Sequence, residues 1–244
     1  MLDEASGRPS VVVTGGTRGI GLAIAARFAG AGYDVYTCGR SEDALAAMRA
    51  RWSEEFQGAA LHATAVDLTD RDQTAAWCDA VLARAGRVDV LVNNAGAFIP
   101  AGIISPAVDV ERELGRMLDL NLWSAVRVTG AMLPAMLARG EGHVFNVCSI
   151  ASLQPHRDGS LYSVSKYALL GYTRALRDET KARGLRVTAV IPGATWSDSW
   201  RGATHPEDRL MPADDIAVMV LASARLSPQS VVEDIVVRPQ LGDL

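Results

Sequence analysis

The stretch Val11-Val12-Val13-Thr14-Gly15-Gly16-Thr17-Arg18-Gly19-Ile20-Gly21 decides the fold of this chain. Its first four residues predict a buried strand, and a helical pattern begins at Gly19. The glycines between them allow a tight turn and let phosphate oxygens come close to backbone amides. The first turn of a helix adds N–H groups without intrahelical partners and a partial positive charge. The stretch therefore predicts a dinucleotide site, although a tight turn without a ligand fits the same glycines.

Strand-like and helix-like segments alternate along the rest of the chain. We predict strands over 11–14, 34–38, 59–66, 88–92, 143–148, 185–191 and 231–237. We predict helices over 19–31, 41–52, 70–85, 108–118, 120–137, 160–183 and 213–225. The strands are apolar throughout, which is typical of a parallel sheet buried on both faces. The alternation predicts right-handed crossovers and an α/β, doubly wound Rossmann fold of about seven strands with helices on both faces.

The composition is that of a globular protein. The chain has 244 residues, of which 49% are hydrophobic and 21% charged, with a formal net charge of −4. This provides enough apolar side chain for a sizeable core and gives no electrostatic reason to expect a nucleic-acid partner. We expect a flexible tail over 1–9, a single catalytic domain over 10–244, and a substrate loop over about 193–212.

The cysteines and the hydropathy indicate a soluble protein. Three cysteines at wide spacings predict neither a disulfide framework nor a metal site, and a cytoplasmic location fits them. The polar, acidic N-terminus is unlike a signal peptide, and the apolar runs are shorter than the roughly 18 residues of a membrane span. We therefore expect no membrane partner.

A second pattern carries acid–base chemistry. Tyr162 and Lys166 are four residues apart and share one face of the predicted helix. A free tyrosine holds its proton tightly near neutral pH, and a neighbouring ammonium group eases its release. The pair alone is a weak signal, but Ser149 ends a predicted strand 13 residues before Tyr162, and Asn121 begins another helical stretch. Singly, Ser149 fits a loop-start serine and Asn121 a helix kink or cap.

These patterns resemble the short-chain dehydrogenase/reductase family, whose glycine motif has the spacing Gly-x3-Gly-x-Gly seen here. The resemblance runs from about Val11 to Val237 and implies an NADP(H)-dependent oxidoreductase that interconverts a carbonyl and an alcohol by hydride transfer. It implies that Tyr162 is the acid/base and that Ser149 hydrogen-bonds the substrate oxygen. It also implies that Lys166 assists Tyr162 and holds the nicotinamide ribose, while Asn121 holds a water that resupplies protons.

The resemblance further implies a set of cofactor contacts. Asp67 would meet the adenine amino group and Asn93 the ribose, although Asp67 or Asp70 also fits a helix cap and Asn93 a plain turn. The expected contacts are Gly15, Thr17, Arg18, Gly19, Ile20, Gly21, Arg40, Asp67, Leu68, Asn93, Ala95, Gly96, Tyr162, Lys166, Pro192, Gly193, Thr195 and Ser197.

The end of the second predicted strand bears on the choice of dinucleotide. A carboxylate there would hold the ribose 2′-hydroxyl and repel a 2′-phosphate. The strand ends instead at Cys38, Gly39 and Arg40, without an acid. Arg40 and Arg18 offer planar cations suited to phosphate. We therefore predict NADP(H) over NAD(H), although Arg40 also fits an ordinary solvated residue.

The substrate is expected to be a small carbonyl compound or alcohol. The residues expected to shape the mouth of its pocket are Phe98, Leu153, His156, Trp196 and Trp200. Each tryptophan fits equally well as loop packing, and His156 fits a surface loop. One rival activity is that of a 3-oxoacyl-(acyl-carrier-protein) reductase, from which the C-terminal part departs. Another is a non-catalytic dinucleotide-binding regulatory protein, against which the complete catalytic set argues.

The predicted helices that hold Asn121 and Tyr162 also bear on assembly. Their apolar positions are Leu118, Leu122, Val126, Leu133 and Leu137 on the first, and Leu169, Leu170 and Leu176 on the second. These stripes fit the interface of a homodimer or homotetramer, and they fit equally well a face packed against the sheet.

Overall fold

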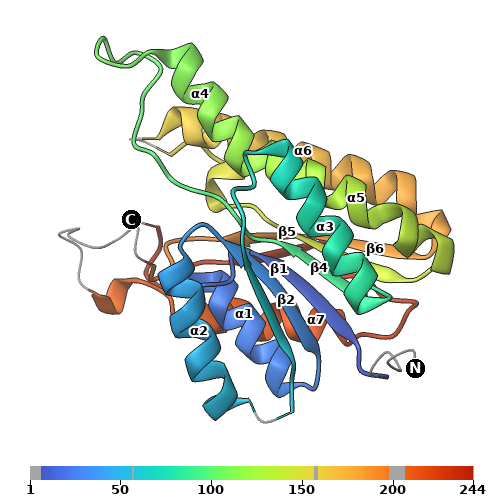
Figure 1. The fold of residues 1–244 in the computed structure, drawn as a ribbon. Coiled ribbons are helices and arrows are strands. Elements are labelled where there is room, and N and C mark those ends of the chain that lie inside the picture. The colour runs from blue at the N-terminus through green and yellow to red at the C-terminus, as the bar shows by residue number, and fades with distance from the viewer. Residues whose placement is uncertain (1–6, 57, 157–158, 198–206, 244) are drawn as a thin grey trace.

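The computed structural model describes residues 7–56, 58–156, 159–197 and 207–243. A sheet with the strand order β3-β2-β1-β4-β5-β6-β7 runs through it (Figure 1). The strands are β1 (Ser10–Thr14), β2 (Asp34–Gly39), β3 (Leu61–Ala65), β4 (Val90–Asn93), β5 (Gly142–Val147), β6 (Leu185–Pro192) and β7 (Asp234–Val237). Every neighbouring pair is parallel. The order reverses between β1 and β4, where open sheets of this kind form a crevice at the carboxyl ends of the strands.

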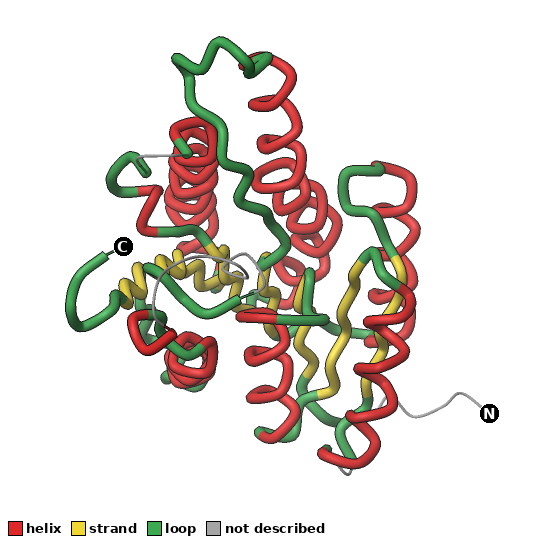
Figure 2. The backbone as a smooth tube through the Cα atoms, turned by 90° about the vertical axis from the view of Figure 1, so that its left-hand side faces the viewer, coloured by secondary structure: helices red, strands yellow, loops and turns green. Residues whose placement is uncertain are grey.

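Helices cover both faces of the sheet, as Figures 1 and 2 show from two directions. They are α1 (Gly19–Gly30), α2 (Glu42–Glu55), α3 (Arg71–Ala85), α4 (Val110–Leu118), α5 (Ser124–Arg139), α6 (Ser160–Thr180) and α7 (Ala213–Ala224). In Figure 1, α1, α2 and α7 lie below the sheet, and α3, α5 and α6 lie above it. The predicted Rossmann fold is thereby confirmed. No helix within the described ranges is both long and apolar enough to cross a membrane.

The apolar strands contribute to cores on both faces of the sheet. Val11 and Val13 pack with Phe28 of α1 on one side of the sheet. Val12, between them, packs with Met132 of α5 on the other. Successive strand residues point to opposite faces, so a strand covered on both faces needs apolar residues at every position. This explains why the central strands lack an alternating pattern.

The two edge strands, β3 and β7, depart from the prediction that every strand is buried on both faces. Thr64 and Ala65 of β3 are exposed, and Val236 of β7 is 49% exposed. Both strands are also shorter than the predicted ranges 59–66 and 231–237. An edge strand has a neighbour on one side only, so its burial depends on its place in the sheet as well as on its own residues.

The two predicted helices around Asn121 form one interrupted helix. A π-helical turn, Asp119–Trp123, joins α4 to α5, and the Ser124 amide donates across five residues to the Asp119 carbonyl. Such a turn accommodates one residue more than an α-helical turn, and it is frequent at functional sites. It places the buried Asn121 side chain at the point where the helix is interrupted.

The leucines proposed for an interface belong to the core where they lie on α6. Leu169, Leu170 and Leu176 are buried, packed against strand residues such as Val187 and Ile191. The sheet-facing alternative is therefore correct for these three, because α6 turns that side toward the sheet. The exposed apolar residues of this layer are Trp123, Val164 and Tyr167 instead.

Candidate functional site

The turn between β1 and α1 is tight, and its glycines have no room for a side chain or adopt a positive φ. Gly15 has a φ of 67°, and its amide donates to the Cys38 carbonyl. The Gly16 amide donates to Thr37 Oγ1 at 3.1 Å. A Cβ on Gly16 would overlap that hydroxyl, and one on Gly21 would overlap the Gly15 carbonyl oxygen. The backbone between β1 and α1 is therefore fixed in a shape that larger residues would break.

The loop after β4 is tied to this turn through Asn94. The Asn94 side-chain amide donates to the carbonyls of Thr14 and Gly15, each at 3.0 Å. The Thr14 hydroxyl accepts in return from the amides of Asn94 and Ala95. Sequence reasoning gave no role to Thr14 or to Asn94. The signal was present, because Asn94 lies inside the Asn93–Gly96 match and Thr14 is the last residue of the strand before the glycine turn.

The N-terminus of α1 is open to an anion. Arg18 holds the N-cap position in an extended conformation with no side-chain cap, and the first turn contains no acidic residue. Ser197, beyond β6, lies beside the turn, because a Cβ on Gly19 would be 3.6 Å from the Ser197 Cβ. Uncapped amides at a helix end, closely approached through glycines, fit the diphosphate of a dinucleotide.

The predicted adenosine end lies beyond β2 and β3. Asp67 Oδ1 accepts from the Thr69 backbone amide at 2.9 Å and from the Thr69 hydroxyl at 2.7 Å. These two hydrogen bonds, and then the charge of Arg40, hold the pKa of Asp67 below its usual value. The cap of α3 is Asp70, which accepts from the amides of Asp72 and Gln73. Arg18 and Arg40 are both exposed.

The side chain of Asn93 points into the interior. It is 3% exposed, and its Nδ2 donates to Thr129 Oγ1 at 2.9 Å and to Asn146 Oδ1 at 2.8 Å. The amide thus braces β4 against β5 and α5, because its donors are used there. The Nδ2 protons are therefore not available to a ribose, and the expected place of Asn93 near the ribose stays a prediction.

Tyr162, Lys166 and Asn121 meet at the end of β4. Lys166 Nζ lies 5.8 Å from the centroid of the Tyr162 ring and donates to the Val147 carbonyl at 2.9 Å. A Cβ on Gly96 would be 2.8 Å from Asn121 Oδ1 and 3.4 Å from Lys166 Nζ. Gly96 is therefore the point where the loop after β4 passes closest to Asn121 and Lys166, two members of the predicted catalytic set.

The amide of Asn121 is fully paired. Its Oδ1 accepts from the Ala97 amide at 2.8 Å, and its Nδ2 donates to the Ala97 carbonyl and the Ser165 hydroxyl, each at 3.0 Å. Ser165 in turn donates to the Tyr162 carbonyl. Asn121 thus ties the loop after β4 to the helix that carries Tyr162 and Lys166.

Ser149 begins a short 3-10 helix, Ile150–Ser152. Its Oγ accepts from the Ala151 amide at 3.1 Å, and its own amide donates to the Ser152 hydroxyl at 3.2 Å. The loop-start interpretation of Ser149 therefore describes a real capping role. The cap uses a lone pair of Oγ and leaves the hydroxyl proton to be donated elsewhere.

Aromatic residues adjoin Tyr162. The ring of Phe98 makes edge contacts with Tyr162 and His156, both at 5.2 Å between centroids. Leu153 is 40% exposed and Trp196 41% exposed, so the Trp196 ring is not packed down under its loop. Trp200, expected at the same mouth, lies outside the described residues. The place of these residues at the mouth of a substrate pocket stays a prediction.

The loop after β6 is anchored at both described ends. The Gly193 amide donates to the Val237 carbonyl, and Thr195, which is 5% exposed, donates its hydroxyl to the Gly193 carbonyl at 3.0 Å. The Trp196 amide donates to the Met211 carbonyl at 2.8 Å. In the described part of the chain, no group of three or more His, Cys, Asp or Glu side chains is placed to hold a metal ion.

Comparison with known proteins agrees with this geometry. A family model described as short chain dehydrogenase matches residues 9–208. The chain belongs to this family. A 1-deoxy-11-beta-hydroxypentalenate dehydrogenase of Streptomyces exfoliatus is 33% identical over 216 residues, which cover 86% of this chain and 78% of the relative. As a short-chain dehydrogenase/reductase, the protein is an oxidoreductase acting on CH–OH or C=O groups.

Solved structures of other short-chain dehydrogenases/reductases superpose over nearly the whole chain. A metagenomic short-chain oxidoreductase in complex with NADP is 33% identical with a TM-score of 0.82, and 95% of this chain and 97% of that one are covered. L-Sorbose reductase from Gluconobacter frateurii, complexed with NADPH and L-sorbose, is 26% identical with a TM-score of 0.86 and 98% coverage of both chains.

Proposed function

We propose that this protein is an NADP(H)-dependent oxidoreductase that interconverts a carbonyl and an alcohol, with Tyr162 as the acid/base. The observation that carries the proposal is the close approach of Gly96 to Asn121 and Lys166. Gly96 lies in the loop after β4, and Asn94 of the same loop hydrogen-bonds the glycine turn. The loop therefore connects the glycine turn to the proposed catalytic residues. A bound nicotinamide would supply or accept the hydride, and the cradle from Gly15 to Gly21 would hold its diphosphate.

The side chains have separate parts in this proposal. Tyr162 gives a proton to the carbonyl oxygen or removes one from the alcohol, and Lys166, with its ammonium near the phenol ring, favours that transfer. Ser149 donates its hydroxyl proton to the same oxygen. Because both Nδ2 protons of Asn121 are already used, a relay water would not accept a hydrogen bond from this amide nitrogen.

Turnover with a panel of carbonyl compounds tests the proposal. The purified protein should oxidise NADPH with ketones or aldehydes, followed as loss of nicotinamide absorbance. Acyl thioesters in the same panel separate a general carbonyl reductase from an acyl-carrier-protein reductase. Failure to bind either NADPH or NADH would refute the proposal.

Arg40 is expected to set the preference for NADPH. Its exposed guanidinium follows β2 directly, where an acid would repel a 2′-phosphate. Arg40→Ala should weaken NADPH binding about tenfold or more, since a hydrogen bond to a charged group is worth about 1.5–3 kcal/mol. NADH binding should change little. Fluorescence titration with both dinucleotides measures the two affinities.

Arg51→Ala is the matched control for Arg40. Arg51 is also exposed and lies on α2, but it pairs with Glu55 of the same helix at 2.9 Å. Its loss should leave both affinities unchanged. Equal affinity of the unaltered protein for NADH and NADPH would show that the preference proposed for Arg40 is wrong.

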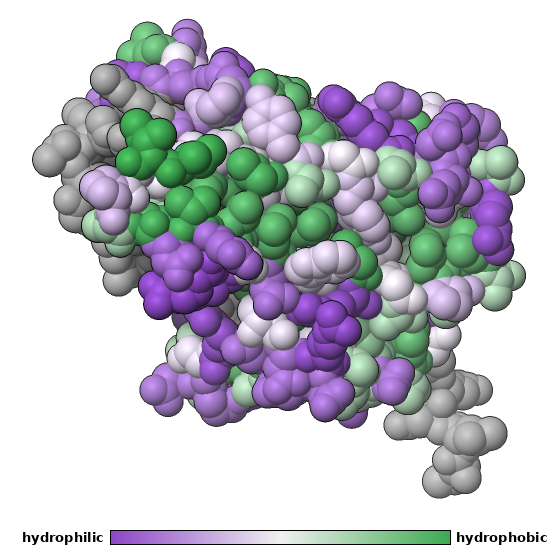
Figure 3. Space-filling view, turned by 90° about the horizontal axis from the view of Figure 1, so that it is seen from above, coloured by the Kyte–Doolittle hydropathy of each residue, from purple (hydrophilic) through white to green (hydrophobic). Residues whose placement is uncertain are grey.

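We further propose a homodimer formed through α5 and α6. Figure 3 shows hydrophobic residues gathered on the upper face of the molecule, between hydrophilic margins. Trp123, Val164 and Tyr167 are each more than 40% exposed on this helical layer. Exposed apolar residues gathered on one face are typical of protein interfaces. Sedimentation of a monomer at micromolar concentration would contradict this part of the proposal.

A further inference from the structure

One guanidinium group links two segments that lie far apart in the sequence. Arg127, on α5, donates through Nη1 to the carbonyls of Leu68 and Thr69, at 3.2 and 3.3 Å. Through Nη2 it donates to Asp119 Oδ1 at 2.7 Å. The Arg127 side chain is 17% exposed. A rigid, planar fork satisfies such divergent acceptors in a way that a lysine ammonium does not.

The acceptors belong to the two ends of the functional site. Leu68 and Thr69 follow Asp67 beyond β3, in the segment near the Arg40 charge. Asp119 is the first residue of the π-helical turn that contains Asn121. Arg127 therefore holds the loop after β3 and the interrupted helix in a fixed relation to each other.

The loop after β3 and the π-helical turn are both held by hydrogen bonds from side chains. The Leu68 carbonyl lies beyond the last strand residue and accepts from Thr74 Oγ1 as well as from Arg127. The π-helical turn departs from the favoured α-helical hydrogen bonding, so surrounding contacts must maintain it. Charge-assisted hydrogen bonds are stronger than neutral ones and are suited to this task.

We infer that Arg127 is a positioning residue that couples the loop after β3, where the adenosine end of a dinucleotide would lie, to the turn that presents Asn121. The inference rests on the proposed function only in the placement of that adenosine. Binding at the loop fixes the carbonyls of Leu68 and Thr69, which fixes the guanidinium and, through Asp119, the turn. The adenosine end of the cofactor thereby orders the region around the catalytic set.

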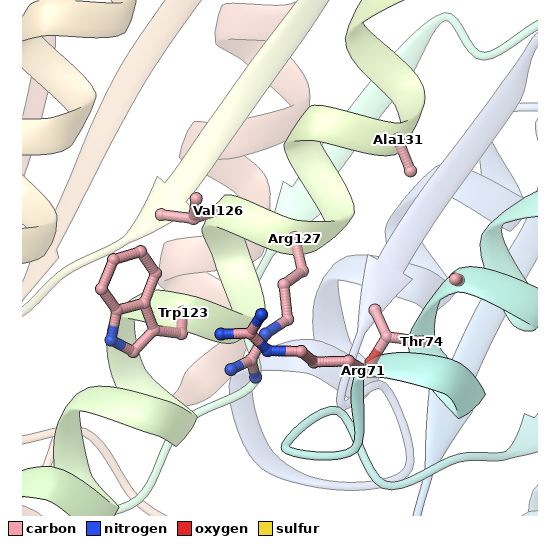
Figure 4. Close-up of a pocket in the computed structure, with 7 residues that line it drawn as sticks. Arg71, Thr74, Trp123, Val126, Arg127 and Ala131 are labelled. Atoms are coloured by element: carbon pink, nitrogen blue, oxygen red, sulfur yellow. The ribbon is translucent and has the colours of Figure 1, made fainter.

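Arg71 provides a matched control beside Arg127. Both arginines line a surface cavity of about 330 Å³, together with Trp123, and Figure 4 shows their guanidinium groups extending into the same space. Arg71 is exposed, and no hydrogen bond or ion pair joins it to another described residue. Arg71→Met therefore removes a positive charge from the same cavity and leaves the hydrogen bonds of Arg127 to Leu68, Thr69 and Asp119 in place.

Hydrogen exchange of the unliganded protein, followed by mass spectrometry, tests the link directly. In Arg127→Met, amide exchange should rise roughly tenfold in both 67–70 and 119–124 and stay unchanged in α7. Arg127→Lys should restore little of the protection. Asp119→Ala, which leaves Nη2 of Arg127 without this acceptor, should release 119–124 while leaving 67–70 protected. Arg71→Met should behave as the unaltered protein.

Adenosine 2′,5′-bisphosphate, which carries only the adenosine end of NADP, tests the coupling. It should slow exchange in 119–124 of the unaltered protein and of Arg71→Met. In Arg127→Met it should slow exchange in 67–70 alone.

Several results would overturn the inference. A rise confined to one segment, an equal rise throughout the chain, or the same response in Arg71→Met would each do so. So would slower exchange in 119–124 of Arg127→Met on addition of the nucleotide. If the nucleotide does not bind the unaltered protein, the proposed dinucleotide site fails, while the exchange of the unliganded variants still decides whether Arg127 links the two segments.

Discussion

Tyr162→Phe is expected to lower kcat by about 10²–10⁴-fold, the usual contribution of a general acid–base group. Affinity for NADPH should stay within about twofold of the unaltered protein, because cofactor binding in the proposed site does not need the phenol proton. The phenylalanine ring keeps the edge contact that Tyr162 makes with Phe98 at 5.2 Å, so the local packing survives. Steady-state turnover and a fluorescence titration with NADPH measure the two quantities.

Tyr167→Phe on the same helix is the control for this substitution. Tyr167 is 43% exposed, on the side of α6 away from the sheet, and has no part in the proposed chemistry. Removing its hydroxyl should change neither kcat nor NADPH affinity. If Tyr162→Phe turned over as fast as the unaltered protein, Tyr162 would not be the acid/base, whatever the cofactor.

Gly21→Ala is expected to damage both the fold and the cofactor site. The added methyl group would overlap the Gly15 carbonyl oxygen and the Asn94 side-chain amide. Neither can yield easily, because one is backbone and the other is held by two carbonyls. Overpacking of this kind costs about 1–3 kcal/mol. At about 2–4 °C per kcal/mol for a chain of this size, Tm should fall by several degrees.

The same substitution should weaken NADPH binding at least tenfold, because the displaced Gly15 carbonyl carries the turn with it. Gly115→Ala in α4 is the control, since nothing lies within 4 Å of a Cβ at that position and alanine is favoured in a helix interior. It should leave binding unchanged and raise Tm slightly. NADPH affinity preserved in Gly21→Ala would contradict the proposed role of the glycine turn.

The sequence predicts the parallel sheet because burial on both faces leaves a local signal, the unbroken apolar strands. It does not predict how far the edge strands extend, since the burial of Thr64 or Val236 depends on which strands lie beside β3 and β7. The π-helical turn is also not predicted, because a shift of one residue in hydrogen bonding barely changes the spacing of apolar side chains.

In the site too, some features can be predicted from local sequence, and others depend on contacts with distant segments. Four residues that are distant in sequence are predicted to form one catalytic set because they match the family's positions, and the structure brings Asn121, Tyr162 and Lys166 together. The opposite directions of Asn93 and Asn94 are not apparent from their type. They follow from the alternation of side chains at the end of β4, with one partner on β5 and the other on β1.

The central place of β1 has a consequence for biosynthesis. Ser10, its first residue, hydrogen-bonds through its amide to Asp89, which is 79 residues later in the chain. A ribosome adding about 5–20 residues per second needs roughly 4–16 s to make that distance. During this interval β1 and β2 can already pair, but the other edge of β1 has no neighbour. Until β4 emerges, the nascent chain therefore exposes an aliphatic strand edge that can pair with another chain.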